Sequence, residues 1–159
     1  MNSSRRSRPS DEWPLFLLDT NIVLTPVRGN ALASFIDDRF GLRRSRVRPM
    51  ISVVTHGEVR VLAGRNDWGN RKLTTLQYAL DNLVTVDINH LDVLDAYVEI
   101  DLFSQRHPDG GRNMGKNDLW IAACTKAAGA TLLTTDKDFD HLAPGLLSLE
   151  YIDPASAKS

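Results

Sequence analysis

The chain has 159 residues, a formal net charge of −1 and 25% charged residues. This length suits one domain with one core, and the near-neutral charge gives no overall signal for a polyanionic partner. No apolar run is long enough to cross a membrane, and the basic N-terminal segment lacks the apolar stretch of a signal peptide. We therefore expect a cytoplasmic protein. The single cysteine, Cys124, excludes an internal disulfide and a cysteine-based zinc site.

Apolar and polar stretches alternate along the chain in a pattern typical of alternating strands and helices. Short apolar runs predict strands at 15–18, 50–54, 84–88, 131–135 and 146–152. Helical spacing and capping residues predict helices at 31–40, 55–64, 71–83, 90–107 and 117–129. This alternation predicts an α/β fold, a three-layer α/β/α sandwich with a mainly parallel central sheet.

One domain is expected, because no second composition regime and no internal repeat is present. It should cover residues 15–153, between a basic, disordered tail at 1–14 and a short C-terminal tail at 154–159. The clearest helix is 90–107, whose spacing puts several apolar residues on one face: Leu91, Leu94, Tyr97, Val98 and Leu102.

Four acids stand where expected strands and helices begin or end: Asp19, Glu58, Asp118 and Asp136. Asp19 follows the first strand and Asp136 follows the fourth. The ligand crevice of an open parallel sheet lies outside the carboxyl ends of its strands, so such acids can converge there. Converged carboxylates repel one another and need a cation between them. Their hard oxygen atoms suit Mg²⁺ or Mn²⁺.

Each acid also has a purely structural interpretation. Asp19 precedes Thr20 and Asn21 and suits a turn; in a metal site, Asn21 would orient its carboxylate. Glu58 completes a Thr55-x-x-Glu58 capping box. Asp118 opens a helix, where the helix dipole favours negative charge by roughly 0.3–1 kcal/mol.

The acids near the fourth strand have the same two interpretations. Asp136 suits an N-cap of a short helix, and Asp138 is an alternative inward-facing acid. Thr135 supplies a hydroxyl that could contact metal or phosphate. Each structural interpretation is reasonable alone, but four coincidences at suitable places favour one acidic metal site.

The glycine-rich segment 110–117 nearly matches a phosphate-binding loop. Asn117 stands where that motif needs Ser or Thr, and the strand that should precede the motif is missing. A flexible loop beside the acidic cleft is the preferred interpretation.

The segments LLDTN, VVTHGEV, KNDLWIAA and LLTTDKDF together resemble the PIN-domain family, and most closely its VapC-type toxins. The resemblance runs from about Leu15 to about Asp153. It implies an α/β/α fold and a Mg²⁺- or Mn²⁺-dependent ribonuclease that cuts structured loops of tRNA or ribosomal RNA. It further implies an antitoxin partner and a homodimer. The metal-binding acids would be Asp19, Glu58, Asp118 and Asp136, supported by Asn21 and Thr135.

In the expected reaction, a divalent ion lowers the pKa of a water that attacks phosphorus, leaving 5′-phosphate and 3′-hydroxyl ends. RNA affinity would come from basic residues that meet phosphates: Arg43, Arg44, Arg46, Arg48 and Lys116. The arginine-rich segment could instead be a solvated loop or a face for an acidic antitoxin. Two other functions stay open: a regulatory module that binds operator DNA with its antitoxin, and a phosphoesterase for small substrates.

Overall fold

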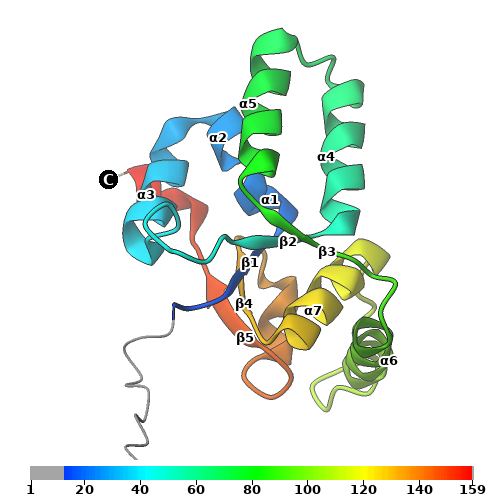
Figure 1. Ribbon diagram of the computed structural model, residues 1–159. Helices are drawn as coiled ribbons and strands as arrows, with labels where there is room; N and C mark the ends of the chain where they lie inside the picture. The colour runs from blue at the N-terminus through cyan, green and yellow to red at the C-terminus, as the bar shows by residue number, and fades with distance from the viewer. Residues whose placement is uncertain (1–12, 159) are drawn as a thin grey trace, which may run out of the picture.

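The central sheet of the computed structural model, which describes residues 13–158, has five parallel strands. They are β1 (Phe16–Leu18), β2 (Met50–Ser52), β3 (Val84–Val86), β4 (Thr131–Thr134) and β5 (Ser148–Tyr151). Their order is β3-β2-β1-β4-β5, and every neighbouring pair is parallel (Figure 1). The predicted parallel α/β sheet is confirmed.

The larger helices match the predicted segments to within a few residues: α3 (Asn30–Phe40), α4 (Val53–Arg65), α5 (Asn70–Asp81), α6 (Leu91–Gln105) and α7 (Lys116–Ala128). Two short helices, α1 (Thr20–Val23) and α2 (Thr25–Arg28), were not predicted from the sequence. Two 3-10 helices, η2 (Lys137–Leu142) and η3 (Pro154–Lys158), follow β4 and β5. Gly41 and Gly129 end α3 and α7 in the left-handed conformation, which glycine adopts at little cost.

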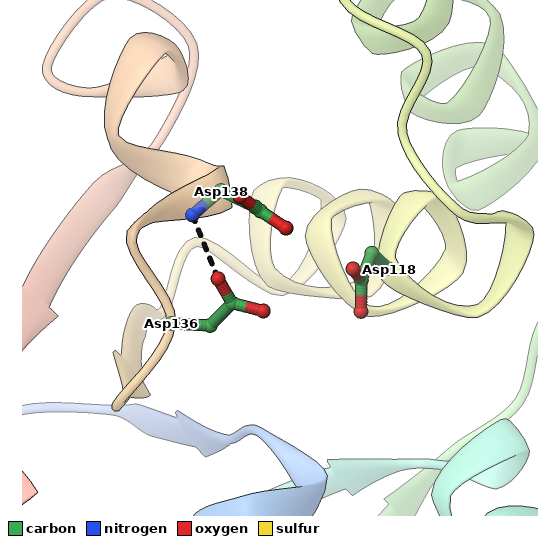
Figure 2. A group of neighbouring side chains, drawn as sticks. All are labelled: Asp118, Asp136 and Asp138. Atoms are coloured by element: carbon green, nitrogen blue, oxygen red, sulfur yellow. Dashed lines mark hydrogen bonds between the residues drawn. The ribbon is translucent and has the colours of Figure 1, made fainter.

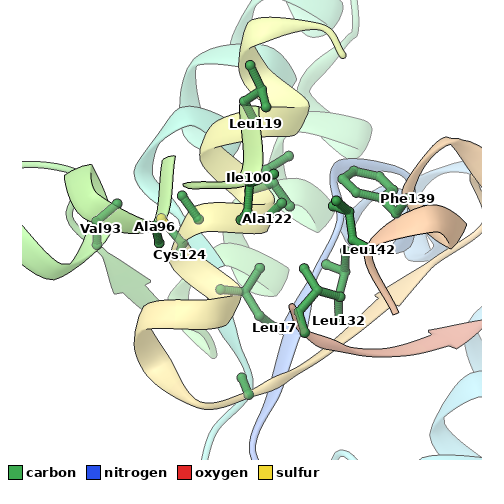
Figure 3. Close-up of a cluster of buried hydrophobic side chains, with 14 residues drawn as sticks. Leu17, Val93, Ala96, Ile100, Leu119, Ala122, Cys124, Leu132, Phe139 and Leu142 are labelled. Carbon is green, nitrogen blue, oxygen red and sulfur yellow. The ribbon is translucent and has the colours of Figure 1, made fainter. Parts of the chain in front are cut away.

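Successive residues of the central strands supply two separate hydrophobic cores. Leu17 and Leu132 belong to the core that α6 and α7 cover (Figure 3), whereas Leu18 and Leu133 belong to the core on the other face. Side chains alternate between the faces of a strand, so adjacent leucines can fill both layers. Cys124 lies in the first core and is fully buried, as expected.

Most of the predicted apolar face of helix α6 is exposed, and of its five residues Tyr97 packs on the core, beside Trp120. Its fully or nearly buried residues are Val93, Ala96, Ile100 and Ser104. Leu91 is 69% exposed and Val98 is 55% exposed, and Leu94 and Leu102 are exposed as well. The helix carries apolar residues around most of its circumference, so the spacing alone selected the wrong stripe.

The structure describes little of the predicted N-terminal tail but most of the predicted C-terminal tail. Residues 1–12 of the predicted N-terminal tail are outside the described residues. The predicted C-terminal tail contains η3, which lies against α3. Within residues 13–158, no helix is long and apolar enough to span a membrane.

Candidate metal centre

The pairing of β1 with β4 brings distant acids to one edge of the sheet. Leu18 pairs with Leu133, and the backbone N–H of Asp19 donates to the carbonyl of Leu133 at 3.0 Å. Asp19 therefore leaves the sheet beside the end of β4, and Asp136 follows two residues after that strand. Asp118 reaches the same edge from the first turn of α7.

Three carboxylates form a compact cluster at this edge. Asp118, Asp136 and Asp138 each place one oxygen within 4.8 Å of the others. The backbone N–H of Asp138 donates to Oδ1 of Asp136 at 2.8 Å, so Asp136 also caps η2. Figure 2 shows the carboxylates of Asp136 and Asp138 pointing towards the first turn of α7, which carries Asp118. The sequence offered Asp138 as an alternative to Asp136, but the fold brings both acids to the cluster.

Asp19 is held in a buried position by two hydrogen bonds. Its Oδ1 accepts from the backbone N–H of Thr20 at 2.8 Å, which makes Asp19 the N-cap of α1. Its Oδ2 accepts from the hydroxyl of Thr134 at 2.7 Å. That same hydroxyl accepts from the backbone N–H of Asp136 at 3.0 Å. Thr134 thus joins Asp19, at the end of β1, to the residues that follow β4, a role that the sequence assigned to no residue.

Glu58 faces Asp19 from α4 and does not form the expected capping box. Helix α4 begins at Val53, and its N-cap is Ser52, whose hydroxyl accepts from the N–H of Val54. Thr55 therefore lies inside the helix. Oε1 of Glu58 accepts from the hydroxyl of Thr20 at 2.9 Å, which ties this carboxylate to the residue after Asp19.

The convergence of these acids is visible in their electrostatics. Burial, followed by the negative charges of Asp19, Asp136, Glu58 and Asp138, raises the pKa of Asp118 to about 7. Burial is also the main cause that raises the pKa of Asp19, and the hydrogen bond from Thr134 opposes it. The other four acids are therefore close enough to Asp118 to oppose its ionisation.

The donor set fits a hard divalent cation. The cluster offers only carboxylate oxygens, without the cysteine or histidine ligands that softer metals prefer. Asp118, Asp136 and Asp138 have the spacing to share one ion, and Asp19 and Glu58 are the neighbouring acids. A bound cation would also relieve the repulsion that raises the pKa of Asp118.

Two expected supporting residues have other surroundings. Asn21 is exposed, and its side-chain oxygen accepts from Arg28 at 3.2 Å; the groups that hold Asp19 are Thr20 and Thr134. Thr135 makes no hydrogen bond to an acid anywhere in residues 13–158. Its neighbour Thr134 is the threonine whose hydroxyl contacts the acids.

The basic residues divide between two places. Lys116 is the first residue of α7, two positions before Asp118, and borders the acidic cluster. The exposed arginines Arg43, Arg44, Arg46 and Arg48 precede β2, so they lie at the amino ends of the strands. In a parallel sheet this is the edge opposite to the acids. The fold thus separates the arginine segment from the candidate metal centre.

A family model described as the PIN domain matches residues 16–144. The chain belongs to the PIN domain family. The matched segment contains every acid of the cluster and all strands except β5. Comparison with curated proteins gives no match.

Solved structures of toxin–antitoxin complexes share the fold of this PIN domain. VapBC2 from Rickettsia felis, bound to a DNA fragment from its promoter, is 22% identical with a TM-score of 0.70, covering 87% of this chain and 99% of that chain. DNA-bound VapBC from Salmonella typhimurium is also 22% identical with a TM-score of 0.70, covering 87% and 98%. VapBC-5 from Mycobacterium tuberculosis is 26% identical with a TM-score of 0.58, covering 87% and 98%. The predicted resemblance to VapC-type proteins therefore agrees with the fold.

Proposed function

We propose that this PIN domain is a divalent-metal-dependent endoribonuclease that cuts structured RNA, in tRNA or ribosomal RNA loops, as the toxin of a type II toxin–antitoxin pair. The convergence of Asp118, Asp136 and Asp138 within 4.8 Å is the observation that carries the proposal. The VapBC complexes that share the fold support the toxin–antitoxin context.

The residues have distinct roles in the proposed reaction. Asp118, Asp136 and Asp138 hold Mg²⁺ or Mn²⁺, with Asp19 and Glu58 beside them. A bound ion supplies charge neutralisation at phosphorus and a lower pKa for the attacking water. Thr134 fixes the buried carboxylate of Asp19, and Thr20 orients Glu58. Water is the proposed nucleophile and the 3′-oxygen is the leaving group, so the products carry 5′-phosphate and 3′-hydroxyl ends, and no histidine is needed as general base.

Cleavage of total cellular RNA tests this function directly. The purified chain is incubated with Mg²⁺, Mn²⁺ or EDTA, and Asp19→Asn is assayed alongside. Discrete fragments are expected with either metal, and none with EDTA or with the variant. Cuts that survive the substitution, or fragments ending in a 2′,3′-cyclic phosphate, would contradict the proposed chemistry. Hydrolysis of a generic phosphoester with RNA left intact would instead identify a small-molecule phosphoesterase.

The RNA contacts follow the division of basic residues. A plot of the logarithm of RNA affinity against the logarithm of salt concentration has a slope that reports the number of phosphate contacts. We expect Lys116→Glu to reduce this slope by about one, because it removes a phosphate contact beside the acids. Arg43→Glu combined with Arg48→Glu should leave that slope unchanged, since these residues lie at the other edge of the sheet. Binding of a short RNA measured across a salt series compares the two variants. A changed slope in the arginine variant would return this segment to the RNA site.

The arginine segment instead suits the antitoxin. Arg43 and Arg48 border an open groove of about 490 Å³ whose apolar lining includes Ile22, Pro26 and Ile36. An amphipathic antitoxin segment with acidic residues beside apolar ones would match both features. The double arginine variant should therefore also lose co-purification with the product of the adjacent reading frame, while RNA cleavage persists.

The proposed homodimer has a candidate surface in the exposed apolar stripe of α6. Leu91, Leu94, Val98 and Leu102 follow helical spacing along one face. A twofold axis across this stripe would pair it with itself and bury it. Light scattering should give the mass of a dimer for the unmodified chain and the mass of a monomer for Val98→Glu. A monomer mass for the unmodified chain would contradict the proposed homodimer.

A second candidate function is operator binding together with the antitoxin. It is favoured by the two similar VapBC structures that contain DNA, one of them from a promoter. Binding of the antitoxin complex to its own promoter fragment, with the Asp19→Asn variant still binding, would support this function independently of cleavage.

A further inference from the structure

The three clustered acids come from two segments that no hydrogen bond joins directly within the described chain. Asp118 stands at the start of α7, and Asp136 and Asp138 stand around the start of η2. A shared ion needs a fixed separation between these segments. Both segments have hydrogen-bonded contacts with the carboxyl end of α6.

Ser104, in the last turn of α6, contacts both segments at once. Its fully buried hydroxyl oxygen lies 2.8 Å from Nε2 of His141, the fifth residue of η2. The same hydroxyl lies 3.3 Å from the sulfur of Met114, just before α7. The backbone carbonyl of Ser104 accepts from the N–H of Arg112 at 2.8 Å. One serine therefore ties η2 and the loop before α7 to the same helix.

The loop 107–115, expected to be flexible, is seated closely on α6. A Cβ atom added at Gly111 would lie 2.7 Å from the carbonyl oxygen of Gln105, closer than real Cβ contacts allow. Only glycine lets the loop approach the end of α6 in this way. The loop then runs directly into Gly115, the N-cap of the helix that carries Asp118.

His141 is the matching element on the other segment. Its ring stacks on Phe103 with centroids 6.4 Å apart and meets His107 edge-on at 5.6 Å. The bond to Ser104 is the side-chain hydrogen bond that holds the His141 ring within the described chain. Loss of this bond would leave Nε2 without its partner and remove the side-chain hydrogen bond between η2 and α6.

We infer that Ser104 and His141 are positioning residues of the metal centre: their hydrogen bond, with the loop seated at Gly111, sets the distance from Asp118 to Asp136 and Asp138. This inference rests on the proposed metal-dependent function. Neither residue belongs to the group of acids that could hold the ion. They act on it through the placement of its ligands, as outer-shell groups do in metal sites.

Isothermal titration of the whole purified chain with Mn²⁺ tests the inference without RNA. Ser104→Ala and His141→Leu should weaken Mn²⁺ affinity by about tenfold, and His141→Gln, which keeps a polar group near Nε2, should recover part of it. Gly111→Ala should weaken the affinity similarly by lifting the loop. Ser148→Ala is the matched control, because it removes another side-chain hydrogen bond, from Thr131, at the opposite edge of the sheet.

Circular dichroism establishes which variants are folded. If Ser104→Ala does not fold, the exposed Gly111→Ala and the His141 pair decide the result. Folded variants that bind Mn²⁺ as tightly as the unmodified chain would overturn the inference, as would an unmodified chain that does not bind Mn²⁺. If the predicted affinities are found and RNA remains uncut, the positioning role stands and the proposed ribonuclease fails.

Discussion

Asp118→Asn is expected to reduce RNA cleavage by at least about a hundredfold, because the loss of outer-shell partners alone costs metal sites roughly 10- to 100-fold. The same change should stabilise the metal-free protein at alkaline pH. The pKa of Asp118, about 7, lies above the ordinary value of 3.8, so the folded chain binds this proton more tightly than the unfolded chain does. The acid therefore destabilises the fold above neutral pH, and the penalty disappears as the pH falls through about 7 towards 4.

Urea unfolding in EDTA measures this linkage. At about pH 8, the asparagine variant should be more stable than the unmodified chain by on the order of 2 kcal/mol, a value reduced from the full shift for solvent screening. At about pH 5 the difference should shrink. Asp95→Asn, which removes one exposed carboxylate from α6, is the charge-matched control. Equal stability of the two variants at alkaline pH would contradict the assigned electrostatics, and undiminished cleavage would remove Asp118 from the metal centre.

Thr134→Val should lower the cleavage rate by roughly 10- to 100-fold, although Thr134 is not one of the proposed metal ligands. The hydroxyl is fully buried, donates to Asp19 and accepts from the N–H of Asp136. Valine has nearly the same shape but offers neither bond, and the fold should lose about 2 kcal/mol of stability. The hydrogen bond from Thr134 lowers the pKa of Asp19, so its loss raises that pKa. Metal-dependent cleavage, which needs the carboxylate ionised, should then move to higher pH.

Thr135→Val is the control for this experiment, because it makes the same chemical change one residue further along. Cleavage rates measured across a pH series should separate the two variants. If Thr135→Val has the larger effect, the hydroxyl that matters is the one that the sequence interpretation favoured, and the role of Thr134 is wrong.

The strands and the convergence of the acids could be predicted because both depend on local patterns and one topological rule. Short apolar runs mark buried parallel strands, and the carboxyl ends of those strands share an edge. The choice between Thr134 and Thr135 could not be predicted in this way. Both follow the same apolar run, and which one faces Asp19 depends on the register of β4 against β1.

The same limit explains the errors in two helices. In α6, the buried stripe combines the large Val93 and Ile100 with the small Ala96 and Ser104, while the leucines lie on the exposed side; both stripes have helical spacing, and packing on α7 selects between them. The predicted strand 50–54 included Val53 and Val54 because they are β-branched, but both belong to helix α4, which Ser52 caps. In both helices, tertiary packing and not residue propensity determined the structure.

The hydrogen bond between Thr134 and Asp19 joins residues 115 positions apart. β4 is made after β1, β2 and β3, and it must insert beside β1 before Asp136 and Asp138 can meet the acids from the first half of the chain. A growing chain that lacks β4 has no complete centre. If the protein is the proposed ribonuclease, it stays harmless to the ribosome that is making it until β4 has been made and paired with β1.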